Sequence, residues 1–547
     1  MADAADLPVT AHYLSHAVTR RFSPLVTDYL ARPDTFKPFV AHPPDYNGIR
    51  DAIAARTRFP TDREGLYQEL LRQYGAMPLP ESVRLNLEKL RQTNCYTVCT
   101  AHQPALFTGA LYFIYKIIHA ARLADDLKTR FPEEDFVPVF YIGSEDNDLD
   151  ELGHFQLGEE VFQWDGGGQQ GAVGRMPTDS LQALLKTVLN RLGPPGAATD
   201  HLTELLQTAY APGQTIASAT RKLVTGLLGD YGIVVIDGDS LALKQKMIPV
   251  FADDLFEHKP YALVTAQSER LSERYPVQAY PRPVNLFYLD GDIRSRIEQT
   301  GADNWQVVGT DLHWNEQQLR DQLANHPETF SPNVVLRGLY QETILPNVAF
   351  IGGGAEVAYW MQLKPLFEAY EIPYPVVVVR QSIQWLPESA TALLQATGLS
   401  LDQLFEDPQA LLSTRAQQEL PQTLAISALK EQIAAQLNPL FQLAAATDAS
   451  LEAYGAAQQH RIGQLIEATG KKILQAEKRK HQIWYQRVLR LQQGLWLHKG
   501  LQERKLTFLD FYPALGSVFL QAIYDHTRPF GNDFLVLTSS TSSSGTS

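Results

Sequence analysis

Apolar residues follow different periods in different parts of the chain, and the changes between them indicate its organisation. Residues 1 to 94 have mostly helical spacing, with breaks at FPTDREG and MPLPES. From residue 96, the β-branched runs YTVCT, FVPVFYIG, GIVVIDGD and YPVVVVRQS alternate with helical segments near 110–128 and 355–370. Apolar strands that alternate with helices are typical of parallel βαβ units covered on both faces. The pattern therefore predicts an α/β fold with a parallel-sheet core.

Two segments interrupt this alternation. The first, FQLGEEVFQWDGGGQQGAVGR, alternates polar and apolar residues and is rich in glycine, so it predicts a β insertion within about residues 155–225 that stands outside the parallel sheet. A second insertion is expected near 280–345, around NLFYLDGDIRSRIEQ and NVVLRGLYQ. Insertions of this kind commonly form the walls of an active site.

The pattern becomes almost wholly helical from about residue 384 to 510. Apolar side chains keep three- and four-residue spacing from Ile426 to Tyr454 and again from Ile462 to Leu495. These imperfect heptads predict a long helical hairpin or a short coiled coil. A single pair of helices would leave part of this apolar stripe in water, so we expect a homodimer through residues of about 424–500.

The expected domains follow from these changes. Residues 1–95 form an N-terminal helical part of the core, 96–390 the core with its two insertions, 391–510 a helical, coiled-coil region, and 511–547 a C-terminal segment. The final TSSTSSSGTS is of low complexity, and we expect it to be disordered. A chain of 547 residues is long enough for several domains with a cleft between them.

The composition argues against several classes of function. The formal net charge is -14, from 47 Lys+Arg against 61 Asp+Glu, which argues against a nucleic-acid or membrane-surface binder. No apolar run is long enough to span a bilayer, and MADAADLPVTAHYLSHAVTRRF lacks the apolar centre of a signal peptide. We therefore expect a cytoplasmic protein.

The cysteine content bears on disulfides and metals. Cys95 and Cys99 are the two cysteines of the chain and lie in one predicted strand. Their Cα atoms would be about 13 Å apart, which is too far for a disulfide. A zinc site needs three or four protein ligands at loop spacing, so we expect no zinc and assign no residue as a metal ligand.

The stretch TAHQPALFTGALYFIYK, residues 100–116, carries more chemistry than a turn requires. It follows the first strand of the α/β part, at the edge where open parallel sheets bind ligands. Thr108 can cap the following helix, and Gly109 lets a ligand approach amides that attract phosphate or carboxylate. His102 and Gln103 can donate hydrogen bonds to phosphate oxygens. The alternative is that His102 is a structural turn histidine.

Polar residues of the following helix form one stripe, Tyr112, Lys116 and His119. Their simplest interpretation is the solvated face of an outer helix. Lys116, which lies near the cleft end, is the member that we retain as a candidate catalytic residue.

Acidic residues follow the second strand in GSEDNDLDEL. Such carboxylates can hold an ammonium group, a sugar or Mg²⁺, and one of them can act as a base. The alternative is that they only favour the first turn of a helix. Glu145 and Asp146 lie nearest the strand end and are the functional candidates.

Gly352, Gly353 and Gly354 precede a helix that carries Glu356, in FIGGGAEVAYWMQLK. The segment has neither the phosphate-binding P-loop motif nor the dinucleotide fingerprint. Successive glycines indicate a close approach to the backbone, either by a ligand or by the protein itself in a tight connection.

Taken together, HQPALFTGALYFIYKII, PVFYIGSEDNDLDEL, NLFY with Arg294 and Arg296, ILPNVAFIGGGAEVAYWMQLK and LQER resemble BshC, the cysteine ligase family of bacillithiol synthesis. These segments occur in order from about residue 90 to 515. The resemblance implies a Rossmann-like core related to class I aminoacyl-tRNA synthetases, two connective-peptide insertions, and a C-terminal α-helical coiled coil that mediates dimerisation. The implied activity joins cysteine to the amino group of glucosaminyl-malate, the last step of bacillithiol biosynthesis.

The resemblance also implies roles for the candidate residues. The segment from His102 to Gly109 corresponds to the histidine signature that binds the nucleotide in those synthetases, so ATP, with Mg²⁺, is the expected energy donor. Glu145 and Asp146 would hold the cysteine ammonium or the sugar. The adenosine side would lie along residues 352–356. The chain departs from the family pattern at Asn147, where histidine is expected, and it has no lysine-rich KMSKS-like loop.

Two other interpretations remain open. A nucleotidyltransferase with a Rossmann-like core would release pyrophosphate and leave a stable nucleotide-linked product. A non-catalytic, nucleotide-binding coiled-coil dimer would bind nucleotide without turnover.

Overall fold

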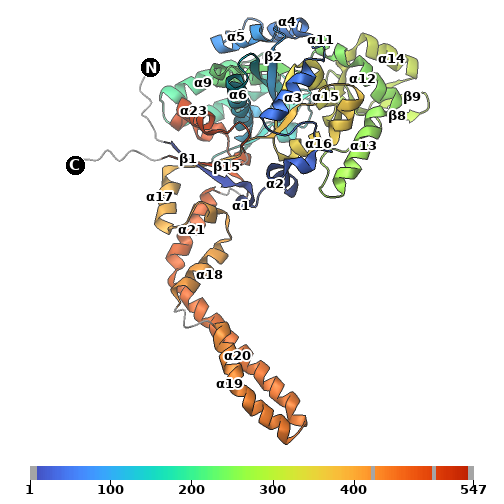
Figure 1. Ribbon diagram of the computed structural model, residues 1–547. Helices are drawn as coiled ribbons and strands as arrows, with labels where there is room; N and C mark the ends of the chain where they lie inside the picture. The colour runs from blue at the N-terminus through green and yellow to red at the C-terminus, as the bar shows by residue number, and fades with distance from the viewer. Residues whose placement is uncertain (1–8, 421–425, 496–499, 532, 540–547) are drawn as a thin grey trace. The chain divides into compact units, whose positions relative to one another are not determined.

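The computed structural model describes residues 9–420, 426–495, 500–531 and 533–539 (Figure 1). The chain divides into two compact units, Met1–Trp385 with Gly500–Ser547, here the core unit, and Leu386–Lys499, here the helical unit. The predicted boundary at residue 510 lies too late in the chain. Gln502 and Glu503 are buried and bond to backbone N–H groups of residues 383–385, which fixes this segment to the core unit.

Parallel strands form the central sheet of the core unit, which confirms the predicted α/β core. The strands are β2 (Cys95–His102), β3 (Asp135–Ile142), β6 (Val234–Asp237), β12 (Asn347–Gly352) and β13 (Val376–Val379), in the spatial order β13-β12-β2-β3-β6. After β6 the chain crosses to the other side of β2. The carboxyl ends of β2 and β12 therefore flank the topological switch point, where open sheets of this kind bind ligands.

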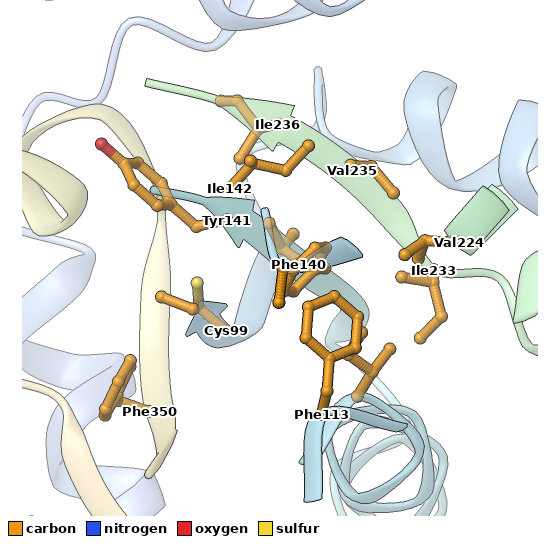
Figure 2. Close-up of a cluster of buried hydrophobic side chains, with 14 of the residues drawn as sticks. Cys99, Phe113, Phe140, Tyr141, Ile142, Val224, Ile233, Val235, Ile236 and Phe350 are labelled. Carbon is orange, nitrogen blue, oxygen red and sulfur yellow. The ribbon is translucent and has the colours of Figure 1, made fainter. Parts of the chain in front are cut away.

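Helices cover the sheet. Helix α6 (Tyr112–Arg130) follows β2, and α16 (Gly354–Ala369) follows β12, close to the predicted ranges. Figure 2 shows Phe113 of α6 beside Phe140 of β3, and the centroids of the two rings are 5.0 Å apart. Both rings are fully buried, so this apolar contact fixes α6, and with it the turn that precedes it, against the sheet.

The first insertion is only partly a β structure. Strands β4 (His154–Leu157) and β5 (Glu160–Gln163) form the expected hairpin. Loops and short 3-10 turns follow, and the longer elements of the range are helices, α8 (Gln182–Leu189), α9 (Ala197–Ala209) and α10 (Ile216–Leu228), which corrects the prediction. The reason is a helical period beyond the glycines, because Leu202, Leu206 and Ala209 are buried along one face of α9.

The second insertion, which the sequence predicted near 280–345 without specifying its structure, is an antiparallel sheet separate from the parallel one. It contains β7 (Leu286–Asp290), β8 (Ile293–Gly301), β9 (Asn304–Val307), β10 (His313–Trp314) and β11 (Phe330–Pro332), in the order β10-β9-β8-β7-β11. Helix α14 (Glu316–Asn325) precedes β11, and α15 (Val334–Ile344) leads back to β12.

The two ends of the core unit meet in a third sheet. Strand β1 (Val9–Ser15) pairs antiparallel with β15 (Asp533–Ser539), and β15 also pairs with β14 (Ile383–Leu386). The sequence predicts helices before residue 95, and α2 (Pro24–Ala31), α3 (Tyr46–Arg56), α4 (Arg63–Tyr74) and α5 (Glu81–Lys89) confirm them, but it misses β1. Of the predicted disordered tail, Thr538 and Ser539 end β15, while residues 540–547 lie outside the described residues.

A buried ion pair joins α3 to α15. The Arg56 guanidinium lies 2.9 Å from the Glu342 carboxylate, and their side chains are 1% and 0% exposed. Arg56 also donates to the backbone oxygens of Glu342, Asn347 and Pro373. Glu342 accepts further hydrogen bonds from Gln341 and Asn347. Burial lowers the pKa of Arg56 to about 10, even with this carboxylate beside it.

The helical unit contains α17 (Glu388–Thr397), α18 (Pro408–Glu419), α19 (Ile426–Thr447), α20 (Ser450–Lys480) and α21 (Gln482–Leu495). Helices α19 and α20 pack as a hairpin, which confirms the prediction (Figure 1). Large apolar side chains stay exposed on it, among them Leu440, Leu443 and Leu465. Within the described residues of both units, no helix has the length and apolar character needed to cross a membrane.

Candidate functional site

A cleft of about 360 Å³ opens in the core unit at the carboxyl ends of the central strands. Ala101 and His102 line it from β2, and the residues that follow β3, β12 and β13 contribute Gly143, Gly353 and Arg380. The second insertion and α15 supply the facing wall with Arg294, Asn333 and Arg337. The cleft therefore occupies the switch point, the position expected from the strand order.

His102 lies at the base of this cleft with both ring nitrogens engaged. Its Nδ1 is 2.9 Å from the Gln103 carbonyl oxygen and its Nε2 is 3.2 Å from the Tyr112 hydroxyl. A carbonyl only accepts hydrogen bonds, so Nδ1 carries the proton of that bond and Nε2 presents a lone pair. Burial, reinforced by the nearby Lys116 cation, lowers the pKa of His102 to about 4. The ring is neutral at pH 7 and must gain a proton before Nε2 can donate to a phosphate.

Gln103 also lines the cleft, and its amide donates to Asp146 Oδ2 over 3.2 Å. This bond joins the turn after β2 to the acidic loop after β3. The two loops that the sequence singled out are therefore in direct contact.

Thr108 and Gly109 are not among the residues that line the cleft. The predicted helix cap at Thr108 is wrong, because α6 begins at Tyr112 and its N-cap residue is Leu111. Residues Leu106–Thr108 form a separate 3-10 turn, in which the Thr108 hydroxyl is buried without a hydrogen-bond partner among the described residues. Gly109 has a φ of 61°, and an added Cβ would lie 3.0 Å from the Ala105 side chain, so glycine is required by the turn itself.

Lys116 is buried beneath the cleft instead of lying on an outer face. Its ammonium donates to the Ala101 carbonyl oxygen over 2.6 Å and to Glu356 Oε2 over 2.7 Å. Burial lowers the pKa of Lys116, although Glu356 opposes this shift. The interpretation of its stripe as a solvated face is wrong, because His119 is also buried and Tyr112 reaches His102.

The Lys116–Glu356 pair connects the helices on the two sides of the switch point. Glu356 Oε2 also accepts a hydrogen bond of 2.8 Å from the backbone N–H of Gly353, the N-cap residue of α16. Burial alone would raise the pKa of Glu356, but Lys116 and this N–H lower it on balance. Glu356 and Gly353 both line the cleft, so the pair fixes the relative position of its two central loops.

The three glycines have different surroundings. A Cβ on Gly354 would lie 2.8 Å from Val26, and one on Gly352 would lie 3.0 Å from the Phe350 ring. At these two positions the close neighbour is the protein itself. A Cβ on Gly353 would have more room, with its nearest atom at 3.5 Å, and this residue faces the cleft together with Gly354.

The two acidic candidates, Glu145 and Asp146, lie in different environments. Glu145 is buried, and its Oε1 lies 2.5 Å from the Lys244 ammonium. Asp146 is more open, with 31% of its side chain exposed, and its nearest cation is Arg294 at 3.9 Å. The charge of Glu145 is thus already balanced by Lys244. Asp146 is the carboxylate with more capacity for a ligand ammonium.

Sequence reasoning missed the arginines that converge on the cleft. Arg337 donates to Gln341 over 3.1 Å and to the Tyr359 hydroxyl over 2.6 Å, and within the described part of the chain it has no carboxylate at ion-pair distance. Arg380 is paired at both nitrogens with Glu503, at 2.8 and 2.6 Å. Arg380 directly follows β13, as His102 ends β2, and this position could have identified it. The mid-helix position of Arg337 gives no such signal.

Arg294 comes from β8 in the second insertion. It donates to Asn147 over 3.0 Å and lies over the Phe287 ring, 4.2 Å from its centroid. Asn147, which stands where the family pattern has histidine, thus joins the acidic loop to the insertion. Among the described residues, no group of three or more His, Cys, Asp or Glu side chains could hold a metal ion, and Cys95 and Cys99 are buried free thiols.

Comparison with known families covers almost the whole chain. The model of the bacillithiol biosynthesis BshC N-terminal Rossmann-like domain matches residues 10–381. The model of the BshC C-terminal coiled-coil domain matches residues 383–539. The two matches together span the core unit and the helical unit.

Curated relatives are similar over the same span. A protein of Flavobacterium johnsoniae named "Putative cysteine ligase BshC" is 34% identical over 527 residues, which cover 96% of this chain and 99% of the relative. The protein of the same name in Christiangramia forsetii is 32% identical over 533 residues, covering 96% and 98%. That of Cytophaga hutchinsonii is 34% identical over 495 residues, covering 90% and 92%.

Among solved structures, a Campylobacter jejuni protein described as "putative arginyl t-RNA synthetase" matches with a TM-score of 0.23 and 11% identity, covering 82% of this chain and 98% of that chain. A TM-score this low supports no argument, so the relation to class I synthetases stays a prediction. The two family models and the full-length relatives agree with the Rossmann-like core and the helical hairpin, and the chain belongs to the bacillithiol biosynthesis family BshC.

Proposed function

We propose that this protein is a cytoplasmic cysteine ligase that joins cysteine to the amino group of glucosaminyl-malate, in the last step of bacillithiol biosynthesis. The observation that carries the proposal is that one cleft, at the switch point of the sheet, holds both an accessible carboxylate and a group of arginines. These groups suit a substrate pair that carries an ammonium group and several carboxylates. The names of the curated relatives support the same activity.

In this proposal the acidic and the basic residues of the cleft bind different groups of the substrates. Asp146, oriented by the amide of Gln103, would receive the cysteine ammonium. Arg337 and Arg294 would receive carboxylates of the acceptor, because a guanidinium offers two parallel N–H donors to a carboxylate. Holding both substrates in one geometry is itself a large part of the catalysis of a ligation.

ATP, with Mg²⁺, would supply the activation of the cysteine carboxylate. The groups available for its phosphates are His102, Gln103 and the open backbone at Gly353, with Arg504 exposed beside them. These are donors and a cation, so the residues present fit an anion. Since His102 is neutral with a pKa of about 4, it would have to gain a proton as a phosphate binds.

Replacing both His102 and Gln103 by alanine is therefore expected to weaken ATP binding by roughly 10- to 150-fold, the effect of losing 1.5–3 kcal/mol of charge-assisted hydrogen bonding. Wild-type binding should also strengthen as the pH falls from the higher pKa of His102 in the complex towards its pKa of about 4 in the free protein, and this dependence should be absent in the variant. Calorimetric titration at several pH values measures both effects. His154→Ala, at the exposed first position of β4, is the control. A large fall in the melting temperature of the double variant, alongside its weaker ATP binding, would show that His102 and Gln103 are structural.

Thiol metabolites of a deletion strain test the function itself. We expect glucosaminyl-malate to accumulate and bacillithiol to be absent, and a plasmid copy of the chain should restore bacillithiol. Unchanged bacillithiol in the deletion strain would contradict the proposal. With purified protein, pyrophosphate release with a stable nucleotide-linked product would indicate a nucleotidyltransferase instead, and ATP binding without turnover would indicate a non-catalytic dimer.

We further propose a homodimer through residues of about 424–500, of which 426–495 are described. The support is the exposed apolar surface of the hairpin, where Leu440 is 60%, Leu443 66% and Leu465 68% exposed. Light scattering should give the mass of a dimer at micromolar concentration, and the triple change of these residues to lysine should give a monomer that keeps its helical content. A monomeric wild-type protein would contradict the proposal.

A further inference from the structure

We propose that Glu145 is the general base that takes the proton of the acceptor amine during ligation, and that Lys244 positions it for this step. The inference rests on the proposed function, because it assigns a role within that reaction. It gives the two neighbouring carboxylates of the acidic loop different tasks.

The first argument is the geometry of the Glu145 carboxylate. Oε1 lies 2.5 Å from the Lys244 ammonium, whereas Oε2 accepts no hydrogen bond from any described residue. Glu145 is buried and also lines the cleft. A carboxylate that a cation holds through one oxygen, in a residue that lines the cleft, keeps its other oxygen available to receive a proton as a general base.

The second argument is that Lys244 is itself rigidly held. Its side chain is 0% exposed, and its ammonium donates to Asp239 over 3.1 Å and to the Glu328 carbonyl over 2.8 Å. Arg175 binds the same Asp239 with two nitrogens, at 2.6 and 2.8 Å. Glu145 is therefore anchored to the loop after β6 and to both insertions, which gives its free oxygen a defined position.

The third argument is the charge balance around the carboxyl group. Burial raises the pKa of Glu145, Lys244 lowers it, Asp239 raises it and Arg294 lowers it. A carboxylate with a raised pKa is a stronger base, and one that a cation keeps ionised is available at neutral pH. The charged and titratable groups that face Glu145 are Lys244, Asp239, Arg175, Arg294, the adjacent Asp146, Tyr141 and Tyr340.

The reaction step starts from the neutral form of the acceptor amine. The nitrogen lone pair forms a bond to the carboxyl carbon of activated cysteine, and the nitrogen gives one proton to Glu145 Oε2. The bond between that carbon and the oxygen of the activating group breaks, and this oxygen leaves with the bonding electron pair. Glu145 then returns the proton to water, and no electron is gained or lost overall.

The first test separates a base from an ammonium ligand. Glu145→Gln keeps the shape of the side chain and an oxygen for Lys244, so we expect kcat to fall by roughly 10²–10⁴-fold while KM for the acceptor changes little. A residue that only binds an ammonium would raise KM instead. Asp150→Asn is the matched control, because Asp150 is an exposed carboxylate of the short helix α7 (Leu149–Leu152), which follows the acidic loop, and does not line the cleft.

The second test uses the pH dependence of kcat/KM. As a base, Glu145 must be ionised, so the rate should rise with pH through its pKa. Lys244→Gln removes a cation and should move this acid limb to higher pH, whereas Asp239→Asn removes an anion and should move it to lower pH, each on the order of 1 unit. Where Lys244→Gln does not fold, Arg294→Gln should give the same upward shift. Infrared spectra of the free protein give a second measure of this pKa. The carboxyl band of Glu145 is the one that disappears in Glu145→Gln, and the pH at which it titrates should shift in the same directions in these variants.

The outcomes separate the two proposals. A wild-type protein with no ligation activity would overturn the proposed function and this inference together. Normal wild-type ligation, with kcat unchanged in Glu145→Gln or an effect confined to KM, would overturn only the base assignment. An acid limb that neither Lys244→Gln nor Asp239→Asn moves would also overturn it.

Discussion

Replacing Arg56 by alanine is expected to lower the free energy of unfolding of the core unit by about 3–5 kcal/mol, the usual cost of removing one partner of a buried ion pair. Arg56 and Glu342 are both fully buried, and Arg56 also satisfies three backbone carbonyls. The alanine variant leaves the Glu342 charge without its cation and those carbonyls without their donor. Burial already raises the pKa of Glu342, and loss of Arg56 would raise it further.

Urea unfolding of the variant, followed by the fluorescence of the core tryptophans, measures this loss. Arg50→Ala is the matched control, because Arg50 lies exposed on the same helix and bonds only to Asn47 among the described residues. Since an uncompensated charge causes most of the loss, the double variant Arg56→Leu with Glu342→Leu should recover part of it. A loss below 1 kcal/mol for Arg56→Ala would show that the pair does not stabilise the core unit.

Replacing Arg337 by glutamine is expected to reduce kcat/KM for ligation by roughly 10- to 150-fold, the equivalent of 1.5–3 kcal/mol of charge-assisted hydrogen bonding. Arg337 lines the cleft, its described hydrogen-bond partners are a neutral amide and a phenol hydroxyl, and its guanidinium also lies over the uncharged rings of Tyr141 and Phe350. An anionic substrate group would therefore be its charge partner. The folded protein loses no ion pair in this variant, so its stability should be almost unchanged.

Steady-state kinetics with the acceptor varied, together with a melting curve, test this combination of effects. Arg337→Lys should be intermediate, because it keeps the charge but not the two-pronged geometry. Arg296→Gln is the control, because Arg296 lies on β8 of the second insertion, pairs with Glu298 and does not line the cleft. Unchanged kinetics in Arg337→Gln, or a large fall in stability, would contradict a substrate-binding role.

The sequence predicted the core well where one physical signal decided the outcome. Continuous apolar runs indicate strands of a sheet buried on both faces, and these runs form β2, β3, β6, β12 and β13. Because the strands are parallel, their carboxyl ends lie at one edge of the sheet. Residues at or shortly after the ends of such strands, His102 and Glu145, accordingly line the cleft. For these residues, a position at the end of a predicted strand was enough to predict a position at the cleft.

The sequence could not show a pairing with a distant partner. Tyr112 and His119 had the spacing of a solvated face, but His119 is buried and Tyr112 contacts His102. Lys116 of the same stripe pairs with Glu356, far along the chain, and the partner of Glu145, Lys244, has no motif of its own. The Thr108 cap failed for a local reason, since a 3-10 turn separates it from the helix. Period and motif carry no information about such long-range pairings.

The antiparallel pairing of β1 with β15 has a consequence for the synthesis of the protein. Each residue from Val9 to Ser15 has its partner between Asp533 and Ser539, so the first described strand pairs with the last. A ribosome releases the chain from its N-terminus onwards, and β1 is exposed as an unpaired strand while more than five hundred further residues are made. The core unit can therefore complete this sheet only after residue 539 has been synthesised, and a chain truncated before residue 533 has an open sheet edge.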